Sequence, residues 1–203
     1  LGLIDFFMIA LHSDSNGVHD RITQRKGSFA QTVSGIENLV GSGAKVGVKV
    51  VISKFNMKRI VDTCKLAKRL GACYVNVAFP HINGSARNNF EAVVPTYSDI
   101  REQLEKVISW SIEEDFDVEF EEVLPCVFEK MYPLKFFPEL KTSRTQGEVM
   151  QLDSDAMLWK DAKSSMKRKG ALCMRCVLGR FCEGYWREYV EWRGFGEFRP
   201  VVR

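Results

Sequence analysis

Apolar residues in this chain fall into two alternating patterns. Short, mostly apolar runs indicate β-strands, and four of them are present, over residues 4–11, 46–52, 73–79 and 117–123. Between these runs, apolar residues recur every three or four positions, which indicates amphipathic helices over residues 29–40, 57–70 and 98–110. The resulting βαβαβαβ order predicts an α/β fold built on a parallel sheet.

Residues at the ends of these elements add to the prediction. The run 4–11 is apolar apart from Asp5, which suits a strand buried on both faces. Asn56 and Ser98 stand just before two of the helices, where their side chains can cap free backbone N–H groups. Gly71 follows the second helix and marks its end.

Clear periodicity is lost after residue 123. Several prolines and the polar run 141–148 predict an irregular connector with one helix near residues 155–167. The last part of the chain is rich in cysteine and aromatic residues, which indicates a small second module. The predicted organisation is an α/β part over residues 1–123, a connector over 124–170 and a Cys-rich module over 171–203.

Composition excludes several classes of protein. The chain has 203 residues, 45% hydrophobic and 27% charged, which is enough apolar material for a buried core and rules out a disordered chain. No apolar run approaches the roughly 20 residues of a membrane helix, and no signal peptide is visible. We therefore expect a cytoplasmic protein without a membrane partner. Because the chain begins at Leu1, directly on a predicted strand, we also expect a processed chain or a fragment.

The C-terminal region is basic, with 10 basic and 4 acidic side chains over residues 163–203. Arginines interleaved with aromatic residues can indicate a nucleic-acid surface. A small module that uses aromatic residues as its core and arginines as counter-charges to thiolates accounts for the same pattern. We therefore expect no nucleic-acid partner.

Three cysteines gather within ten residues: Cys173, Cys176 and Cys182. The Cys-x2-Cys spacing lets two thiolates face one centre, and Cys126, at the end of the fourth predicted strand, is positioned to complete a set of four. Zinc usually takes two paired knuckles rather than one cysteine plus three, whereas an iron–sulfur cluster is also held by four thiolates. The set therefore favours a cluster, with zinc and unliganded thiols as the alternatives. Cys64 and Cys73 are expected to be small buried residues.

Ligand sites of parallel α/β folds lie at the carboxyl ends of the strands. His12 and His81 follow two of the strands and are candidate catalytic groups, since histidine is the commonest acid–base side chain. Hydrogen bonding within a loop is the alternative role. Glu121 shares an acidic strand face with Asp117 and Glu119. This face is either part of a site or a solvated edge that discourages pairing with other chains.

With these residues in place, the chain resembles the C-terminal part of a radical S-adenosylmethionine (SAM) enzyme with an auxiliary iron–sulfur module of the SPASM or twitch kind. Stretches similar to the later barrel strands and their loops are residues 7–14, 19–29, 48–56 and 75–86. Stretches similar to the cluster-binding tail are Pro125-Cys126, the three clustered cysteines, Glu183-Gly184-Tyr185-Trp186 and Gly196-Glu197-Phe198-Arg199-Pro200.

The resemblance implies the C-terminal half of a partial (βα)6 barrel followed by a small Cys-rich cluster module. It assigns SAM binding at the barrel mouth to Ser53, Asn56, Phe79 and Gly84, with His12 beside them. It assigns an auxiliary [4Fe-4S] cluster to Cys126, Cys173, Cys176 and Cys182. Ala10 stands where the family often has a serine, so no binding role is carried onto it.

The Cys-x3-Cys-x2-Cys loop that holds the family's catalytic cluster is absent, so this chain alone is expected to be inactive. In a full-length protein, SAM and a second [4Fe-4S] cluster would generate a 5'-deoxyadenosyl radical. The resemblance implies hydrogen abstraction from a peptide or small-molecule substrate, with electrons from a reductant protein such as a flavodoxin or ferredoxin. The alternative function is a zinc-stabilised four-cysteine binding module without catalysis.

Overall fold

The computed structural model describes residues 4, 6–140 and 166–202. The chain divides into two compact units, Leu1–Val123 and Leu124–Arg203. The helix predicted near residues 155–167 lies almost wholly outside the described residues. Within the part of the chain that is described, no helix is long and apolar enough to cross a membrane.

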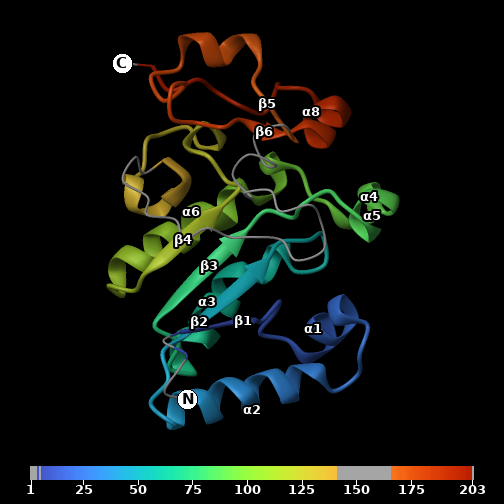
Figure 1. The fold of residues 1–203 in the computed structure, drawn as a ribbon, viewed down its shortest axis with the longest axis vertical. Helices are drawn as coiled ribbons and strands as arrows, with labels where there is room; N and C mark the ends of the chain where they lie inside the picture. Colours follow the sequence, from blue (N-terminus) through green and yellow to red (C-terminus); the bar gives the residue numbers. More distant parts are fainter. Residues whose placement is uncertain (1–3, 5, 141–165, 203) are drawn as a thin grey trace. The chain divides into compact units, whose positions relative to one another are not determined.

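A four-stranded parallel sheet forms the centre of the first unit (Figure 1). Its strands lie side by side in chain order and are β1 (Phe7–Ala10), β2 (Val46–Val51), β3 (Tyr74–Ala78) and β4 (Val118–Glu121). Lys49 lies opposite Asn76, and Asn76 lies opposite Glu119. The predicted α/β fold with a parallel sheet is confirmed, whereas closure into a partial barrel stays a prediction.

Amphipathic helices cover the apolar face of this sheet. They are α2 (Ser28–Gly41), α3 (Ile60–Arg69) and α6 (Tyr97–Glu113), and each contacts at least one strand. Strand side chains alternate between the two faces, so Val48 and Val50 share one face while Lys49 lies on the other. Both valines are fully buried, and so are Leu104 and Ile108 of α6. Burial of each such side chain stabilises the fold by about 1.5–3 kcal/mol.

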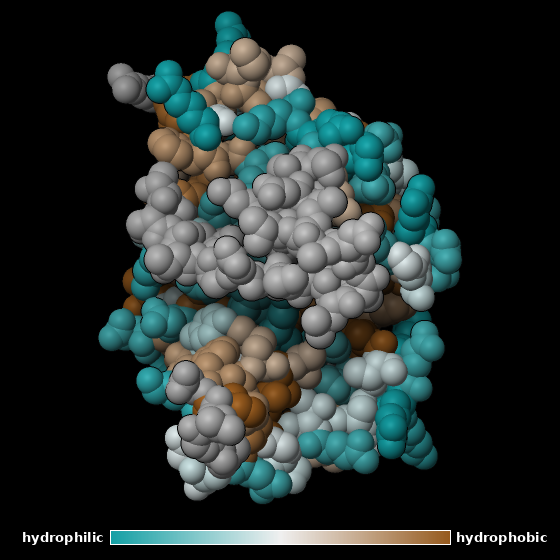
Figure 2. Space-filling model, viewed as in Figure 1, coloured by the Kyte–Doolittle hydropathy of each residue, from teal (hydrophilic) through white to brown (hydrophobic). Residues whose placement is uncertain are grey.

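The opposite face of the sheet is polar and partly exposed. Lys49, Asn76, Glu119 and Glu121 lie on it, and Met8 at its edge is 40% exposed. The prediction that the first strand is buried on both faces is therefore wrong. Among the described strands β1 pairs only with β2, and Figure 2 shows brown apolar patches in the half of the view that holds β1 and α2.

Several element ends differ from the sequence prediction. Thr96, rather than Ser98, caps α6: its hydroxyl accepts a hydrogen bond from the Asp99 N–H at 3.1 Å, and the Asp99 carboxylate accepts one from the Thr96 N–H at 3.0 Å. Asn56 precedes the 3-10 turn η1 (Met57–Arg59) but makes no side-chain cap bond. Short helices also occupy predicted loops: α1 (Asn16–Thr23), α4 (Ser85–Asn88) and α5 (Phe90–Val93).

The second unit consists of short elements around an aromatic core. Strands β5 (Lys167–Arg168) and β6 (Tyr185–Trp186) pair antiparallel and are followed by helix α8 (Arg187–Arg193). The 3-10 turns are η2 (Pro125–Val127), η3 (Leu134–Phe136), η4 (Pro138–Leu140) and η5 (Ala171–Arg175). The rings of Tyr185 and Phe198 stack with centroids 3.7 Å apart. This unit spans residues of both the predicted connector and the predicted Cys-rich module.

Candidate functional site

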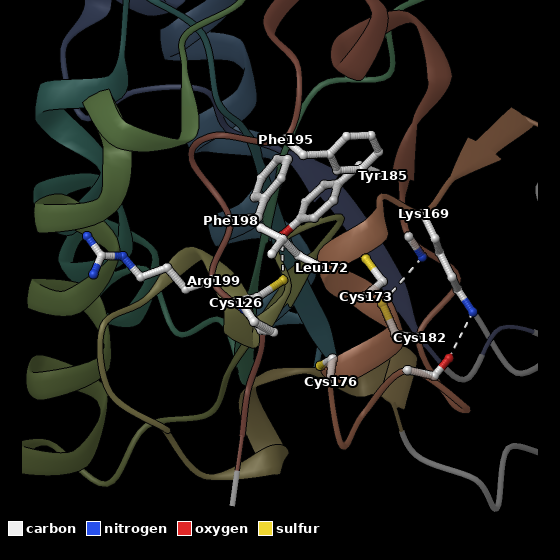
Figure 3. Close-up of a pocket in the computed structure, with 13 residues that line it drawn as sticks. Cys126, Lys169, Leu172, Cys173, Cys176, Cys182, Tyr185, Phe195, Phe198 and Arg199 are labelled. Carbon is white, nitrogen blue, oxygen red and sulfur yellow. Dashed lines mark hydrogen bonds between the residues drawn. The ribbon is translucent and has the colours of Figure 1, made fainter.

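Four cysteines line one pocket of the second unit (Figure 3). Cys126 lies in η2, Cys173 lies in η5, Cys176 ends that turn, and Cys182 precedes β6. The pocket is otherwise lined largely by the apolar or aromatic residues Leu172, Tyr185, Phe195, Phe198 and Pro200. The structure therefore brings together all four cysteines that the sequence indicated as a set.

Tight turns gather the three clustered cysteines. The Cys176 N–H donates to the Cys173 carbonyl at 3.2 Å, and the Gly179 N–H donates to the Cys176 carbonyl at 3.0 Å. A Cβ on Gly179 would lie only 2.8 Å from the Cys173 carbonyl oxygen and 3.0 Å from that of Cys176. Glycine is thus required for the backbone to double back on itself between the second and third cysteines.

Polar groups approach two of the sulfurs. The Tyr185 hydroxyl lies 3.2 Å from Cys126 Sγ, and the Gly184 N–H donates to Cys182 Sγ at 3.3 Å. Gly184 has φ +92°, and a Cβ there would lie 2.3 Å from the Arg168 carbonyl oxygen. Figure 3 shows the Tyr185 hydroxyl pointing at Cys126, while the Arg199 guanidinium points away from the cysteines.

Burial in the pocket raises the pKa of two of its thiols, those of Cys126 and Cys182. Burial raises the pKa of the Cys126 thiol to about 12, although the Tyr185 hydrogen bond opposes the shift. Burial also raises the pKa of Cys182, opposed by the Gly184 N–H and the charge of Lys169. Thiolates in such an apolar pocket need a positive partner, and a bound metal provides one.

The four cysteines line the pocket without converging on one point. Within the described ranges, no three His, Cys, Asp or Glu side chains converge closely enough to hold a single metal ion. The cysteines line a pocket instead. Gly179 and Gly184 line it as well, and a Cβ at either position would clash with backbone atoms. Four thiolates are the donor set of structural zinc sites and of iron–sulfur clusters alike.

The other two cysteines differ in environment. Cys64 is fully buried in α3, as predicted, and burial raises its pKa to about 12. Cys73, just before β3, is exposed, so the prediction that it is a buried small residue is wrong.

The residues predicted to form a site at the strand ends do lie at or near those ends. Most of them, however, make hydrogen bonds, ring contacts or ion pairs with other residues of the chain. Asn56 is 1% exposed and fastens the ends of β1 and β2 together. Its Oδ1 accepts from the Ser53 N–H at 2.6 Å and the Ser53 hydroxyl at 3.1 Å. Its Nδ2 donates to the carbonyls of His12 at 2.7 Å and Val51 at 2.9 Å. The structure thus shows Asn56 and Ser53 as a structural latch, and SAM binding by them stays a prediction.

His12 sits beside this latch. Its backbone N–H donates to His19 Nδ1 at 3.2 Å, and the two rings stack with centroids 5.7 Å apart. Burial, followed by the charge of His19, lowers the pKa of His12 to about 4, so the ring is neutral near pH 7. Asp14 lies in the same loop and forms a bidentate pair with Arg59 at 2.7 and 2.8 Å.

Phe79 and Gly84 lie in different environments, one buried and the other open. The Phe79 ring is fully buried and stacks on Tyr97 at 4.0 Å, and its N–H donates to the Glu121 carbonyl. Its side chain therefore belongs to the core on the helix-covered face. Gly84 stands at the start of α4 with φ +55° and open space around it. A role for either in binding SAM stays a prediction.

His81 and Glu121 are brought together by the structure. Glu121 accepts two hydrogen bonds from Lys49 Nζ, at 2.7 and 3.0 Å, and lies 3.9 Å from His81 Nε2. Neither Lys49 nor Asn76 was indicated by the sequence reasoning. The signal was present, because each is the polar residue inside an otherwise apolar strand.

Comparison with solved structures finds two chains with a similar fold. The structure of Streptococcus suis SuiB bound to S-adenosylmethionine matches with a TM-score of 0.53 and 13% sequence identity, over 96% of this chain and 52% of that chain. A second structure of SuiB matches with a TM-score of 0.51 and 12% identity, over 98% of this chain and 54% of that one. The fold is similar to that of SuiB. The chain spans about half the length of the SuiB chains, and no family model and no curated protein matches its sequence.

Proposed function

We propose that this chain belongs to a radical SAM enzyme and carries its auxiliary [4Fe-4S] cluster, with Cys126, Cys173, Cys176 and Cys182 as ligands. The observation that carries the proposal is the gathering of these four cysteines around one largely apolar pocket. The similarity of the fold to a SuiB structure bound to S-adenosylmethionine supports the family.

The chain's own residues would prepare the pocket for a cluster. The glycine turn at Gly179 sets the spacing of the clustered cysteines, and the Gly184 N–H and Tyr185 hydroxyl supply hydrogen bonds to sulfur. The aromatic lining limits the approach of water. When bound, such a cluster transfers electrons or offers an iron site to a substrate.

The proposal extends to the strand ends of the first unit. His12, Ser53, Asn56 and the segment from Phe79 to Gly84 lie at or near the carboxyl ends of β1, β2 and β3, where parallel α/β folds bind their ligands. We place SAM there. The proposal also includes a peptide or small-molecule substrate, and a flavodoxin or ferredoxin as the protein that supplies electrons. The Cys-x3-Cys-x2-Cys loop is not among the 203 residues, so the proposal assigns no catalytic [4Fe-4S] cluster to them.

Anaerobic reconstitution with iron and sulfide tests the cluster. We expect a brown protein with about four irons and four acid-labile sulfides per chain, which a Cys173→Ala or Cys176→Ala variant fails to form in full. Cys64→Ala is the matched control, since Cys64 lies in the other unit and should leave the iron content unchanged.

Zinc is the competing occupant. Anaerobic purification after expression with both metals in the medium should yield iron and sulfide in the protein. A colourless protein with one zinc per chain, which iron and sulfide fail to replace, would rule out the iron–sulfur assignment and favour a zinc-stabilised binding module.

A further inference from the structure

The turns that carry three of the four candidate ligands also present apolar side chains to solvent. Met174 is 89% exposed, Val177 45% and Phe181 52%, and all three lie between cysteines in the sequence. The cysteines line the pocket, whereas these three side chains are not part of its lining. Over residues 173–182 the chain therefore alternates between side chains in the pocket and apolar side chains in solvent.

Backbone hydrogen bonds hold these exposed residues in a compact segment. The Phe181 N–H donates to the Leu178 carbonyl at 3.0 Å, and the Val177 N–H donates to the Val201 carbonyl at 2.9 Å. The second bond brings the end of the chain alongside, where Val202 is 65% exposed. Single exposed apolar residues are ordinary, whereas several in one segment indicate an interaction site. We call Met174, Val177, Phe181 and Val202 the apolar patch.

Cations stand between and beside the residues of the apolar patch. The stretch 166–182 contains no Asp or Glu. Arg175 and Arg180 are exposed, and neither forms an ion pair with any of the residues that the structure describes. Lys169 is exposed too, and its Nζ donates to the Gly179 carbonyl at 2.8 Å, which holds a third positive charge against the same turns.

The rest of this unit does not offset these charges. Residues 166–202 carry eight basic and four acidic side chains. Glu183, the first acid after the stretch without acids, lies 3.2 Å from Nζ of the buried Lys167. Glu188 lies 3.9 Å from Arg187 Nε. A surface with unpaired cations around apolar residues attracts a partner with negative charge.

The pattern favours one kind of partner over two others. A second copy of this chain, docked about a two-fold axis, would place like charges opposite one another. Single-stranded nucleic acids stack their bases on several aromatic rings, and Phe181 is the only aromatic residue over residues 171–182. An acidic protein with apolar residues of its own fits both the cations and the apolar patch.

We propose that the apolar patch, with Arg175 and Arg180, is the docking surface for an acidic one-electron carrier protein. The patch lies on the turns of Cys173, Cys176 and Cys182, so a docked carrier comes close to the pocket that they line. Electron-transfer complexes bury less than about 1,200 Å² in total, so a small surface suffices.

The redox step is a transfer of one electron from the reduced carrier to the oxidised cluster. The carrier is oxidised by one electron and the cluster is reduced by one, and no bond forms or breaks. This step rests on the function proposed above, because it needs the cluster. The docking itself depends only on the charges and apolar side chains of the surface.

The first experiment measures docking by calorimetry, on the 203-residue chain as purified and again after reconstitution with iron and sulfide. A plant-type ferredoxin and a flavodoxin serve as acidic carriers, and cytochrome c serves as a basic one. We expect saturable binding of at least one acidic carrier and none of cytochrome c. Raising the salt from about 50 to about 300 mM should weaken this binding about tenfold, because salt screens charges across the interface.

Charge reversal locates the binding on this surface. Arg175→Glu and Arg180→Glu should each weaken carrier binding about tenfold, since each places a carboxylate opposite the acidic partner. Arg25→Glu is the matched control, because it makes the same change at an exposed position of the first unit. It should bind the carrier as the wild type does.

An apolar substitution tests the patch itself. Met174→Ser should weaken carrier binding about fivefold by removing apolar contact area. At 89% exposure this side chain contributes little to the packing of the chain, so the variant should fold normally. Ile112→Ser, at a 55% exposed apolar position in α6, is its control and should leave binding unchanged.

A kinetic measurement then separates docking from cluster assembly. At limiting concentration of the reduced acidic carrier, Arg175→Glu should slow reduction of the reconstituted protein about tenfold. Reduction by photoreduced deazaflavin, a small molecule that needs no docking surface, should keep its rate. Iron and sulfide contents equal to those of the wild type establish that the variant assembles its metal site.

Three results would overturn the docking surface: no saturable binding of either acidic carrier to either form of the chain, binding unchanged in both Arg175→Glu and Arg180→Glu, or equal weakening by Arg25→Glu. Binding of phosphatidylserine vesicles in place of the carriers, abolished by Arg175→Glu, would assign the patch to a lipid surface and overturn it as well. Failure of iron loading with carrier binding retained would instead overturn the cluster and leave the docking surface in place.

Discussion

The hydroxyl of Tyr185 lies 3.2 Å from the sulfur of Cys126, although 59 residues separate them in the chain. The same tyrosine stacks on Phe198, which fixes its ring in the core of the second unit. Its side chain is therefore held with the hydroxyl aimed at one of the four candidate ligands. If Cys126 is a thiolate ligand, the tyrosine is the donor in this contact.

Replacement of Tyr185 by Phe should change the electronic properties of the cluster more than its assembly. A hydrogen bond to a ligand sulfur favours the reduced, more negative state of a cluster, so its loss should lower the reduction potential. A bond worth about 1 kcal/mol corresponds to about 40 mV for a one-electron couple. A redox titration followed by electron paramagnetic resonance measures the shift. An unchanged potential at full iron content would show that Cys126 is not a ligand in contact with this hydroxyl.

Replacement of Gly179 by Ala should prevent full cluster assembly. The added methyl group would lie 2.8 and 3.0 Å from two cysteine carbonyl oxygens, so the turn has to open and the cysteines separate. Gly196→Ala is the matched control in the same unit, because nothing lies within 4 Å of a Cβ at that position. Iron and sulfide content after reconstitution provides the measurement. Equal loading of the two variants would contradict this role of Gly179.

Replacement of Asn56 by Ala should destabilise the first unit by about 3 kcal/mol. The change removes four hydrogen bonds and leaves buried groups of Ser53, His12 and Val51 without their partner. Asn83→Ala removes an exposed side chain from a loop and should cost less than about 0.5 kcal/mol. Urea unfolding of both variants measures the difference. A small effect at Asn56 would mean that the latch does not hold the strand ends together.

Acid should destabilise the first unit through His12. Its pKa in the folded chain is lowered to about 4 from 6.5, so the folded state binds the proton more weakly than the unfolded state does. The contribution to stability is full above pH 6.5 and is lost as pH falls toward 4, by about 2 kcal/mol after allowance for partial exposure. His12→Asn should lose less stability than the wild type between pH 7 and pH 4 in urea unfolding. Parallel losses in the two proteins would contradict this assignment.

The alternating strands and helices were predictable because long amphipathic segments repeat a strong pattern. The stripe from Ile100 to Ile108 lies in α6, and the run from Val46 lies in β2. Short elements were not predictable in this way. Helix α4 spans Ser85–Asn88 and contains no buried residue, so no periodicity could reveal it. The choice between Thr96 and Ser98 as a cap depends on a reciprocal bond with Asp99, which composition alone does not decide.

The cysteine set was found because its spacing is unusual, and Cys126 because it ends a predicted strand. The sequence indicated Glu121 but not its partner Lys49, because their pairing depends on three-dimensional proximity. Lys49 and Glu121 meet across β3 at a sequence separation of 72 residues, and their strands looked like ordinary buried or edge strands in the sequence. Cys73 was misjudged because a cysteine next to a strand can face either solvent or core, and only the fold decides which.

The position of Cys126 relative to the other three cysteines has a thermodynamic consequence. About 47 residues separate it from Cys173, so a cluster held by all four ties the two ends of a long loop together as a disulfide does. A cross-link of that length removes about 4 kcal/mol of chain entropy from the unfolded state. The second unit, whose strands β5 and β6 contain only two residues each, would then owe its resistance to heat and to proteases largely to its metal.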